Sequence, residues 1–149
     1  MIQYKVDTPQ IGLKYTKGGF PAIKIQMSRD AADFIRQFYS DDIHLYESFF
    51  LLLLNKANNT IGYAKISQGG VCGTVVDTII IAKYAIDALA STVVLAHNHP
   101  SGNLKPSQAD IDMTKKVKEA LKLFNVAVLD HIILAPENGY YSFADDGML

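Results

Sequence analysis

One stretch of this chain predicts three consecutive pieces of structure: a buried strand, a tight turn and an amphipathic helix. The apolar residues 92–96 lead into His97-Asn98-His99, and Pro100-Ser101-Gly102 then turns the chain. Side chains two residues apart in a strand lie on the same face of the sheet. We therefore expect His97 and His99 to point at one place, with Asn98 pointing away from it.

The turn leads into a helix that begins near Ser107 and runs to about residue 124. Its apolar residues recur at the spacing of one buried stripe, which comprises Met113, Val117, Ala120, Leu121 and Phe124. At roughly 100° per residue, Asp110 lies within about 20° of Val117 around the helix axis, whereas Asp112 falls among the lysines. A carboxylate on a buried face is costly unless it is paired or binds a metal. Asp110 is therefore predicted to face the two histidines.

Two imidazoles and one carboxylate suit a zinc ion. Zinc binds neutral histidine nitrogen at about 2.0–2.1 Å, and a hydrolytic site keeps one position for water. We predict that His97, His99 and Asp110 bind Zn²⁺. Each part also has an ordinary structural explanation, because Ser107-x-x-Asp110 is close to a helix capping box and a single buried histidine is commonly a core residue. The combination favours the metal site, and a serine can cap a helix while presenting its hydroxyl to a site.

Hydrolysis also needs a general base within hydrogen-bonding reach of the water. Glu47 is the candidate, since it begins the predicted strand on the same face as Phe49, Leu51 and Leu53. A carboxylate beside so much apolar surface should have a raised pKa. An exposed glutamate at the start of a strand fits these residues at least as well, so they leave the role of Glu47 open.

The composition limits the classes of protein to which the chain can belong. Its 149 residues fit one domain over residues 28–149, preceded by an N-terminal extension or edge strands over residues 1–27. A net charge of −1 gives no general basic field for nucleic acid, although a local patch stays open. The single cysteine, Cys72, excludes an internal disulfide. Because the sequence shows no signal peptide and no apolar run of about 20 residues, we expect a soluble, cytoplasmic protein without a membrane partner.

The remaining segments predict an α/β fold, in which a mixed sheet is flanked by helices. One helix is expected from its N-cap Ser28 to about Tyr39, and another over residues 78–90 with Asp77 as its cap. Two hairpins are expected, one from strands 46–54 and 61–67 and one from strands 126–134 and 140–143.

These residues together resemble the JAMM (JAB/MPN) metalloprotease superfamily. The pattern of that superfamily is an upstream Glu, then His-x-His, seven residues, Ser, two residues and Asp, and it is matched here by Glu47, His97, His99, Ser107 and Asp110. The nearer resemblance is to the RadC branch, and it covers about residues 28–149 through the segments 96–102, 106–110, 129–133 and 141–143. Asn98 stands where peptidase members usually carry Ser or Thr.

The resemblance implies an α/β/α sandwich similar to that of zinc deaminases, and it implies a role for each residue. His97, His99 and Asp110 would bind zinc with a water as the fourth ligand. Glu47 would take a proton from that water and give it to the leaving amine, and Ser107 would hydrogen-bond the oxyanion. The activity implied is hydrolysis of an amide bond in a peptide or protein substrate.

Two other functions stay open at this point. One is a DNA-repair or recombination role of the RadC kind that uses the same metal, and the other is a non-catalytic metal-binding module. A nucleoside deaminase is excluded, because it needs a Pro-Cys-x-x-Cys pair. His131 is expected to be either a hydrogen-bonded core histidine or a residue beside the metal. His44 and Lys83 are expected to be solvated, Cys72 is expected to be buried, and the oligomeric state is not predicted.

Overall fold

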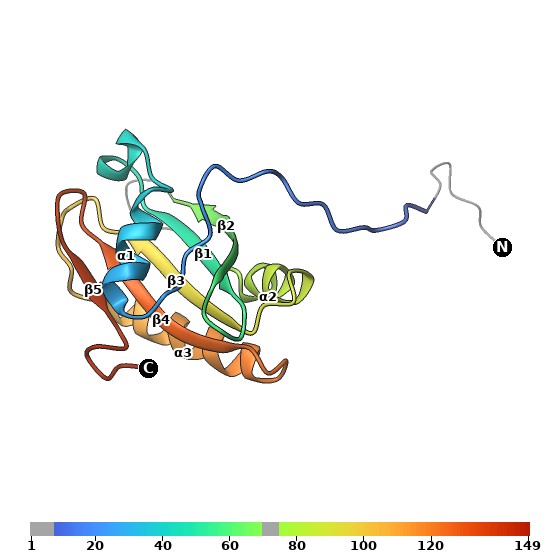
Figure 1. The fold of residues 1–149 in the computed structure, drawn as a ribbon. Coiled ribbons are helices and arrows are strands. Elements are labelled where there is room, and N and C mark those ends of the chain that lie inside the picture. Colours follow the sequence, from blue (N-terminus) through green and yellow to red (C-terminus); the bar gives the residue numbers. More distant parts are fainter. Residues whose placement is uncertain (1–7, 70–74) are drawn as a thin grey trace.

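A mixed β-sheet forms the centre of the molecule. The computed structural model describes residues 8–69 and 75–149, and within them the sheet has five strands in the order β2-β1-β3-β4-β5 (Figure 1). Strands β3 and β4 are parallel, and the other neighbouring pairs are antiparallel. The strands are β1 (Ser48–Leu54), β2 (Thr60–Gln68), β3 (Thr92–Asn98), β4 (Ala127–Leu134) and β5 (Tyr140–Ser142).

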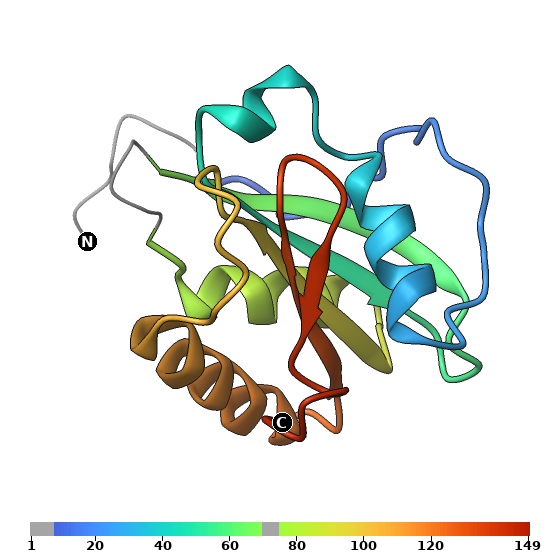
Figure 2. The same ribbon diagram turned by 90° about the vertical axis from the view of Figure 1, so that its left-hand side faces the viewer.

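Helices cover both faces of this sheet. Helix α1 (Ser28–Arg36) lies on one face, and α2 (Thr78–Asp87) and α3 (Gln108–Lys122) lie on the other (Figures 1 and 2). A short 3₁₀ helix, η1 (Asp41–His44), lies between α1 and β1. The arrangement is an α/β/α sandwich, which confirms the predicted fold class.

Strand β1, an inner strand of the sheet, is apolar from Phe49 to Leu54 because both of its faces are covered. All seven of its residues are buried, as expected for a strand with helices on both sides. Leu51 and Leu53 pack into the core shared with α2 and α3, whereas Leu52 and Leu54 pack into the core shared with α1. Strict alternation therefore divides one run of leucines between two hydrophobic cores.

The topology brings the start of β1, the end of β3 and the start of α3 to one edge of the sheet. Because β1 is antiparallel to β3, Phe49 near the start of β1 pairs with His97 near the end of β3. The connection from β3 to the parallel strand β4 runs through α3, which crosses back over the sheet (Figure 2). Residues far apart in the sequence thus meet beyond the carboxyl end of β3.

Most predicted elements are present with small changes in their bounds. Both hairpins form, β1 with β2 and β4 with β5. Asp77 caps α2 as predicted, since its Oδ1 accepts a hydrogen bond from the Ile79 amide at 3.0 Å. His44 and Lys83 are exposed, as expected.

Two local predictions are wrong. The N-cap of α1 is Met27 rather than Ser28, because the Asp30 carboxylate accepts the backbone N–H of Met27, while the Ser28 hydroxyl bonds to Tyr140 and Asp145. Phe124 does not continue the buried stripe. Helix α3 ends at Lys122, and Phe124 is 52% exposed.

The N-terminal residues contribute little regular structure. Residues 8–22 contain no helix or strand, and Lys24 forms an isolated antiparallel bridge with Asn59. The division at residue 28 stays a prediction, and Cys72 lies outside the described residues. Among the residues that the structure describes, no helix has both the length and the apolar character needed to cross a bilayer.

Candidate metal centre

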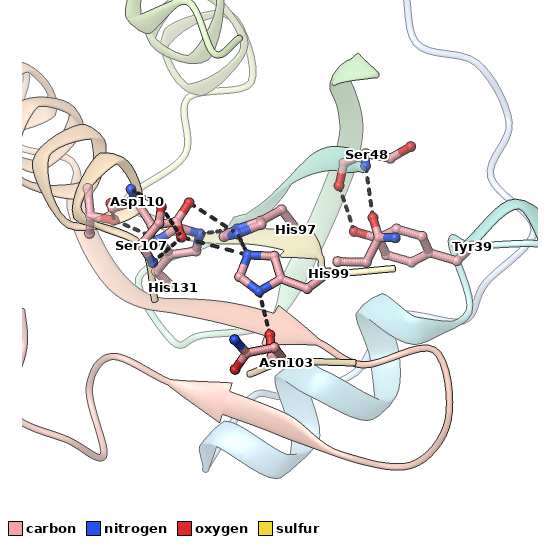
Figure 3. Close-up of polar contacts among 10 residues, drawn as sticks. Tyr39, Ser48, His97, His99, Asn103, Ser107, Asp110 and His131 are labelled. Atoms are coloured by element: carbon pink, nitrogen blue, oxygen red, sulfur yellow. Dashed lines mark hydrogen bonds and ion pairs between the residues drawn. The ribbon is translucent and has the colours of Figure 1, made fainter. Parts of the chain in front are cut away.

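Four side chains converge at the edge where β1, β3 and α3 meet. Glu47, His97, His99 and Asp110 each offer one ligand atom, and these atoms lie within 4.8 Å of one another. His97 Nε2 is 3.0 Å from His99 Nε2 and 3.3 Å from Asp110 Oδ1, and His99 Nε2 is 3.7 Å from Asp110 Oδ2 (Figure 3). The structure therefore brings together the three predicted ligands and the predicted base.

The spacing of the candidate ligand atoms around His97 Nε2 suits a single tetrahedral ion. Ligand atoms placed about 2.0–2.1 Å from a zinc ion at tetrahedral angles are about 3.3 Å from one another. His97 Nε2 lies 3.0 Å from His99 Nε2 and 3.3 Å from Asp110 Oδ1, close to that value. The other carboxylate oxygen, Asp110 Oδ2, lies 3.7 Å from His99 Nε2. A cation can be held here without large movement of His97, His99 or Asp110.

The hydrogen bond of His99 fixes which of its ring nitrogens carries the proton. Its Nδ1 lies 2.6 Å from the carbonyl oxygen of Asn103. A carbonyl only accepts, so Nδ1 must carry the hydrogen and donate it. In the neutral ring, Nε2 then has a free lone pair that is directed at His97 and Asp110.

A chain of buried hydrogen bonds fixes the proton of His97 in the same way. Thr114 Oγ1 donates to the carbonyl oxygen of Asp110 at 2.6 Å, so it must accept from His131 Nδ1, also at 2.6 Å. His131 Nε2 therefore accepts, and the hydrogen bond of 2.8 Å to His97 Nδ1 is donated by His97. The His97 Nε2 atom is left with its lone pair facing the site.

This pattern of protons calls for a positive charge at the centre. Two nitrogen lone pairs face each other across 3.0 Å, with a carboxylate beside them. Such an arrangement is repulsive unless a proton or a cation lies between the donors. Neutral imidazole and carboxylate are among the ligands of zinc. On its chemistry and on its spacing, the donor set fits a metal ion.

Aromatic rings enclose the two buried histidines. His97 is 1% exposed and His131 is fully buried. Phe49 stacks beside His97 with ring centroids 6.0 Å apart, and Phe143 stacks on His131 at 4.7 Å. Burial, and then the neighbouring His97, lower the pKa of His131 well below its ordinary value. His131 therefore stays neutral, as the hydrogen-bond chain requires.

Asp110 is held by the capping box that the sequence predicts. Its Oδ2 accepts hydrogen bonds from the Ser107 hydroxyl and the Ser107 amide, both at 2.7 Å, and its own amide donates to Ser107 Oγ. Oδ1 is left facing His97. Burial raises the pKa of Asp110, but the neighbouring His97 and His99 and the hydrogen bonds from Ser107 outweigh it and hold the pKa far below the ordinary value. Asp110 is therefore ionised.

The structure places Ser107 beside the candidate ligand Asp110. Its hydroxyl proton is directed at Asp110 Oδ2, which stabilises the carboxylate in its position. The capping role and a role at the site thus coexist in one side chain. The oxyanion role stays a prediction.

Glu47 lies immediately before β1 and is half-buried beside the ligands. Burial is the main cause that raises its pKa, and the Asp110 carboxylate adds to it, whereas His97 and His99 lower the pKa in part. A carboxyl group with a raised pKa next to a metal-ligand set is suited to accept and return a proton.

Sequence reasoning did not include Thr114 and left the position of His131 open. Thr114 is one helical turn after Asp110 and is buried, so the i, i+4 spacing could have identified it. His131 proves to be both a buried core histidine and a hydrogen-bonding partner of His97. That second contact depends on the pairing of β3 with β4, which local periodicity does not reveal.

Comparison with known proteins identifies the family. The model of the RadC-like JAB domain matches residues 25–148, which include every residue of the site. The chain belongs to this family.

Curated relatives share this domain over part of their length. A UPF0758 protein from Flavobacterium johnsoniae is 42% identical over 125 residues, which are 84% of this chain and 53% of the relative. A UPF0758 protein from Porphyromonas gingivalis is 42% identical over 103 residues, 69% of this chain and 45% of the relative. The UPF0758 protein YfjY from Escherichia coli K12 is 40% identical over 103 residues, 69% of this chain and 64% of the relative. The chain thus spans about half the length of the curated relatives it matches.

Proposed function

We propose that this chain is a zinc-dependent hydrolase that cleaves a peptide or isopeptide bond. The observation that carries the proposal is the placement of Glu47, a carboxyl group with a raised pKa, within 4.8 Å of three converging ligand atoms. A metal held only for stability needs its ligands but needs no such acid–base group beside them.

His97, His99 and Asp110 would hold the zinc. When bound, zinc lowers the pKa of a coordinated water to about 7 and polarises a carbonyl oxygen. The chain itself supplies the fixed direction of its ligands. The hydrogen-bond chain through His131 keeps the hydrogen of His97 on Nδ1, and Asn103 does the same for His99.

Glu47 would move the proton. As a carboxylate, it accepts a proton from the attacking water, and as a carboxylic acid it returns the proton to the amine that leaves. The raised pKa brings both forms closer to equal population near neutral pH, which is the condition for efficient transfer in both directions.

Ser107 would stabilise the negative charge that develops on the substrate oxygen. To do so, its hydroxyl exchanges the hydrogen bond to Asp110 Oδ2 for one to that oxygen. Asp110 Oδ2 still accepts from the Ser107 amide, so the ligand keeps its position during the exchange.

Zinc analysis combined with an internally quenched peptide library tests the proposal. The proteins compared are the wild type, Glu47→Gln and the control Glu119→Gln, since Glu119 is exposed on α3. We expect about one zinc per chain in all three, and cleavage that is slower by about 10²–10⁴-fold in Glu47→Gln alone. Equal cleavage by the wild type and Glu47→Gln would contradict the proposal. Stoichiometric zinc without cleavage would favour a non-catalytic metal module.

A further inference from the structure

Asn98 lies between the two histidines, but its side chain faces the other way. It is the last residue of β3 and is fully buried. Its Oδ1 accepts the Ser48 amide at 2.8 Å, and its Nδ2 donates to the carbonyl oxygens of Ile43 and Tyr46, each at 2.8 Å. Both amide hydrogens and the amide oxygen are therefore bonded to the segment that carries Glu47.

These bonds lie on both sides of Glu47. The Tyr46 carbonyl precedes it and the Ser48 amide follows it, and both are held by the same side chain. The carbonyl oxygen of Glu47 itself accepts the Gly69 amide at 2.9 Å. Successive peptide groups around the candidate base are thus fixed.

Tyr39, which follows the end of α1 at Arg36, adds another hydrogen bond to this segment. Its hydroxyl donates to the Ser48 carbonyl oxygen at 2.9 Å (Figure 3). Burial, followed by the charge of Glu47, raises the pKa of Tyr39 well above its ordinary value, so the hydroxyl keeps the proton that it donates. Among these contacts, Asn98 alone comes from the strand that carries the histidines.

We propose that Asn98 is a positioning residue that sets the place of Glu47 relative to the metal ligands. The inference rests on the proposed function, because it assumes that Glu47 acts on a water at the metal. Its physical basis is the alternation of a strand: His97 and His99 face the metal, and the residue between them holds the peptide groups that flank the base. One three-residue unit thereby fixes the distance between ligands and base. Since a displacement of about 1 Å can slow a reaction about 100-fold, a tight connection matters.

The first test separates the position of Glu47 from metal binding. We compare Asn98→Ser and the isosteric Asn98→Asp with Thr60→Val, a control that removes the Thr60 hydroxyl bonded to the Ile23 amide at the far end of the β1–β2 hairpin. In Asn98→Ser, we expect hydrogen exchange of the Ser48 amide to accelerate at least about tenfold, because its acceptor is lost. Zinc affinity should stay within about threefold of the wild type, since all three ligands remain.

Asn98→Asp keeps the acceptor for Ser48 and loses the two donated bonds. Its Ser48 amide should therefore exchange more slowly than in Asn98→Ser, and Thr60→Val should leave it unchanged. In protein loaded with Co²⁺ as the probe, the paramagnetic shift of the Glu47 amide should change in the two Asn98 variants only. Unchanged Ser48 exchange and an unchanged Glu47 shift in folded Asn98→Ser would overturn the proposal.

The second test asks whether Asn98 acts through Glu47. With the internally quenched peptide library as the probe, Asn98→Ser should slow cleavage by about 10–100-fold, but should change the residual rate of Glu47→Gln by less than about twofold. Equal slowing in both backgrounds would contradict the inference. If the wild type cleaves nothing, the proposed function fails, while Ser48 exchange and the Co²⁺ shift still decide the role of Asn98.

Discussion

The two sides of the candidate metal centre are held in different ways. On the ligand side, the hydrogen bonds reach the ring nitrogens and the carboxylate themselves, as in the bond from His97 Nδ1 to His131. On the base side, the bonds from Asn98 reach the peptide groups before and after Glu47. Histidine ligands must keep their hydrogen on the same ring nitrogen, whereas a general base must gain and lose a proton in each reaction cycle. We therefore expect changes on the ligand side to alter metal affinity, and changes on the base side to alter the rate.

The largest effect on the ligand side is expected from Asp110→Ala. This substitution removes the charged ligand atom that faces His97. Loss of a residue that only hydrogen-bonds a ligand lowers metal affinity by up to about 100-fold, so loss of the ligand itself should lower zinc affinity further. A competition titration with a chromophoric chelator measures this. The matched control is Asp112→Ala, two residues further along α3 and exposed, which should bind as the wild type does. Similar affinities in the two variants would show that Asp110 is no ligand.

His131→Phe tests the hydrogen-bond chain rather than a ligand. The new ring can still stack on Phe143, but His97 Nδ1 loses its acceptor. Zinc affinity should fall by about 10–100-fold. His44→Phe, at an exposed histidine of η1, is the control and should have no effect. If the zinc titrations of His131→Phe and His44→Phe coincide, the hydrogen-bond chain through His131 has no influence on zinc affinity.

The pH dependence of zinc binding sharpens the comparison further. The neighbouring Asp110 carboxylate is the main cause that raises the pKa of His99 above 6.5. Protonated histidine cannot bind a metal, and protonated His99 is populated below that raised pKa. Zinc affinity should therefore decline as the pH falls. The decline should begin at a higher pH than it would for an ordinary histidine, and it should reach about tenfold per pH unit once His99 is mostly protonated. Titrations between about pH 5 and pH 8 check this, and a flat profile would count against it.

The smallest effect is expected from Ser107→Ala. Loss of the helix cap should lower the free energy of unfolding by about 1 kcal/mol, measured by urea denaturation. Asp110 Oδ2 keeps the Ser107 amide as a donor, so zinc affinity should fall by less than about tenfold. Gln108→Ala, at the exposed neighbouring position, serves as the control. A loss of zinc affinity as large as that of Asp110→Ala would make Ser107 far more important to the metal than its geometry suggests.

The parts of the site that follow from local periodicity could be predicted from the sequence. His97 and His99 share a face because a strand alternates, and Asp110 faces them because of its angle on the helix. The pairing of Phe49 with His97, which brings Glu47 to the histidines, is a tertiary fact. The sequence residues alone left Glu47 open, and the resemblance to a family was needed to favour it.

The contacts of the supporting residues could not be predicted, because each contact joins elements that are distant in the sequence. Thr114 on α3 meets His131 on β4, and His131 meets His97 on β3. The sequence correctly turns Asn98 away from the histidines, but it does not show that Ser48 lies on that side. Periodicity gives the direction of a side chain, and only the packed structure gives its partner.

X-ray absorption of the zinc-loaded protein tests the central claim most directly, because it reports the number and the kind of atoms around the ion. We expect one zinc per chain, with only nitrogen and oxygen neighbours at about 2.0–2.1 Å and outer scattering from two imidazole rings. A sulfur neighbour at about 2.3 Å, a single imidazole, or no stoichiometric zinc would contradict the claim that His97, His99 and Asp110 together bind the ion.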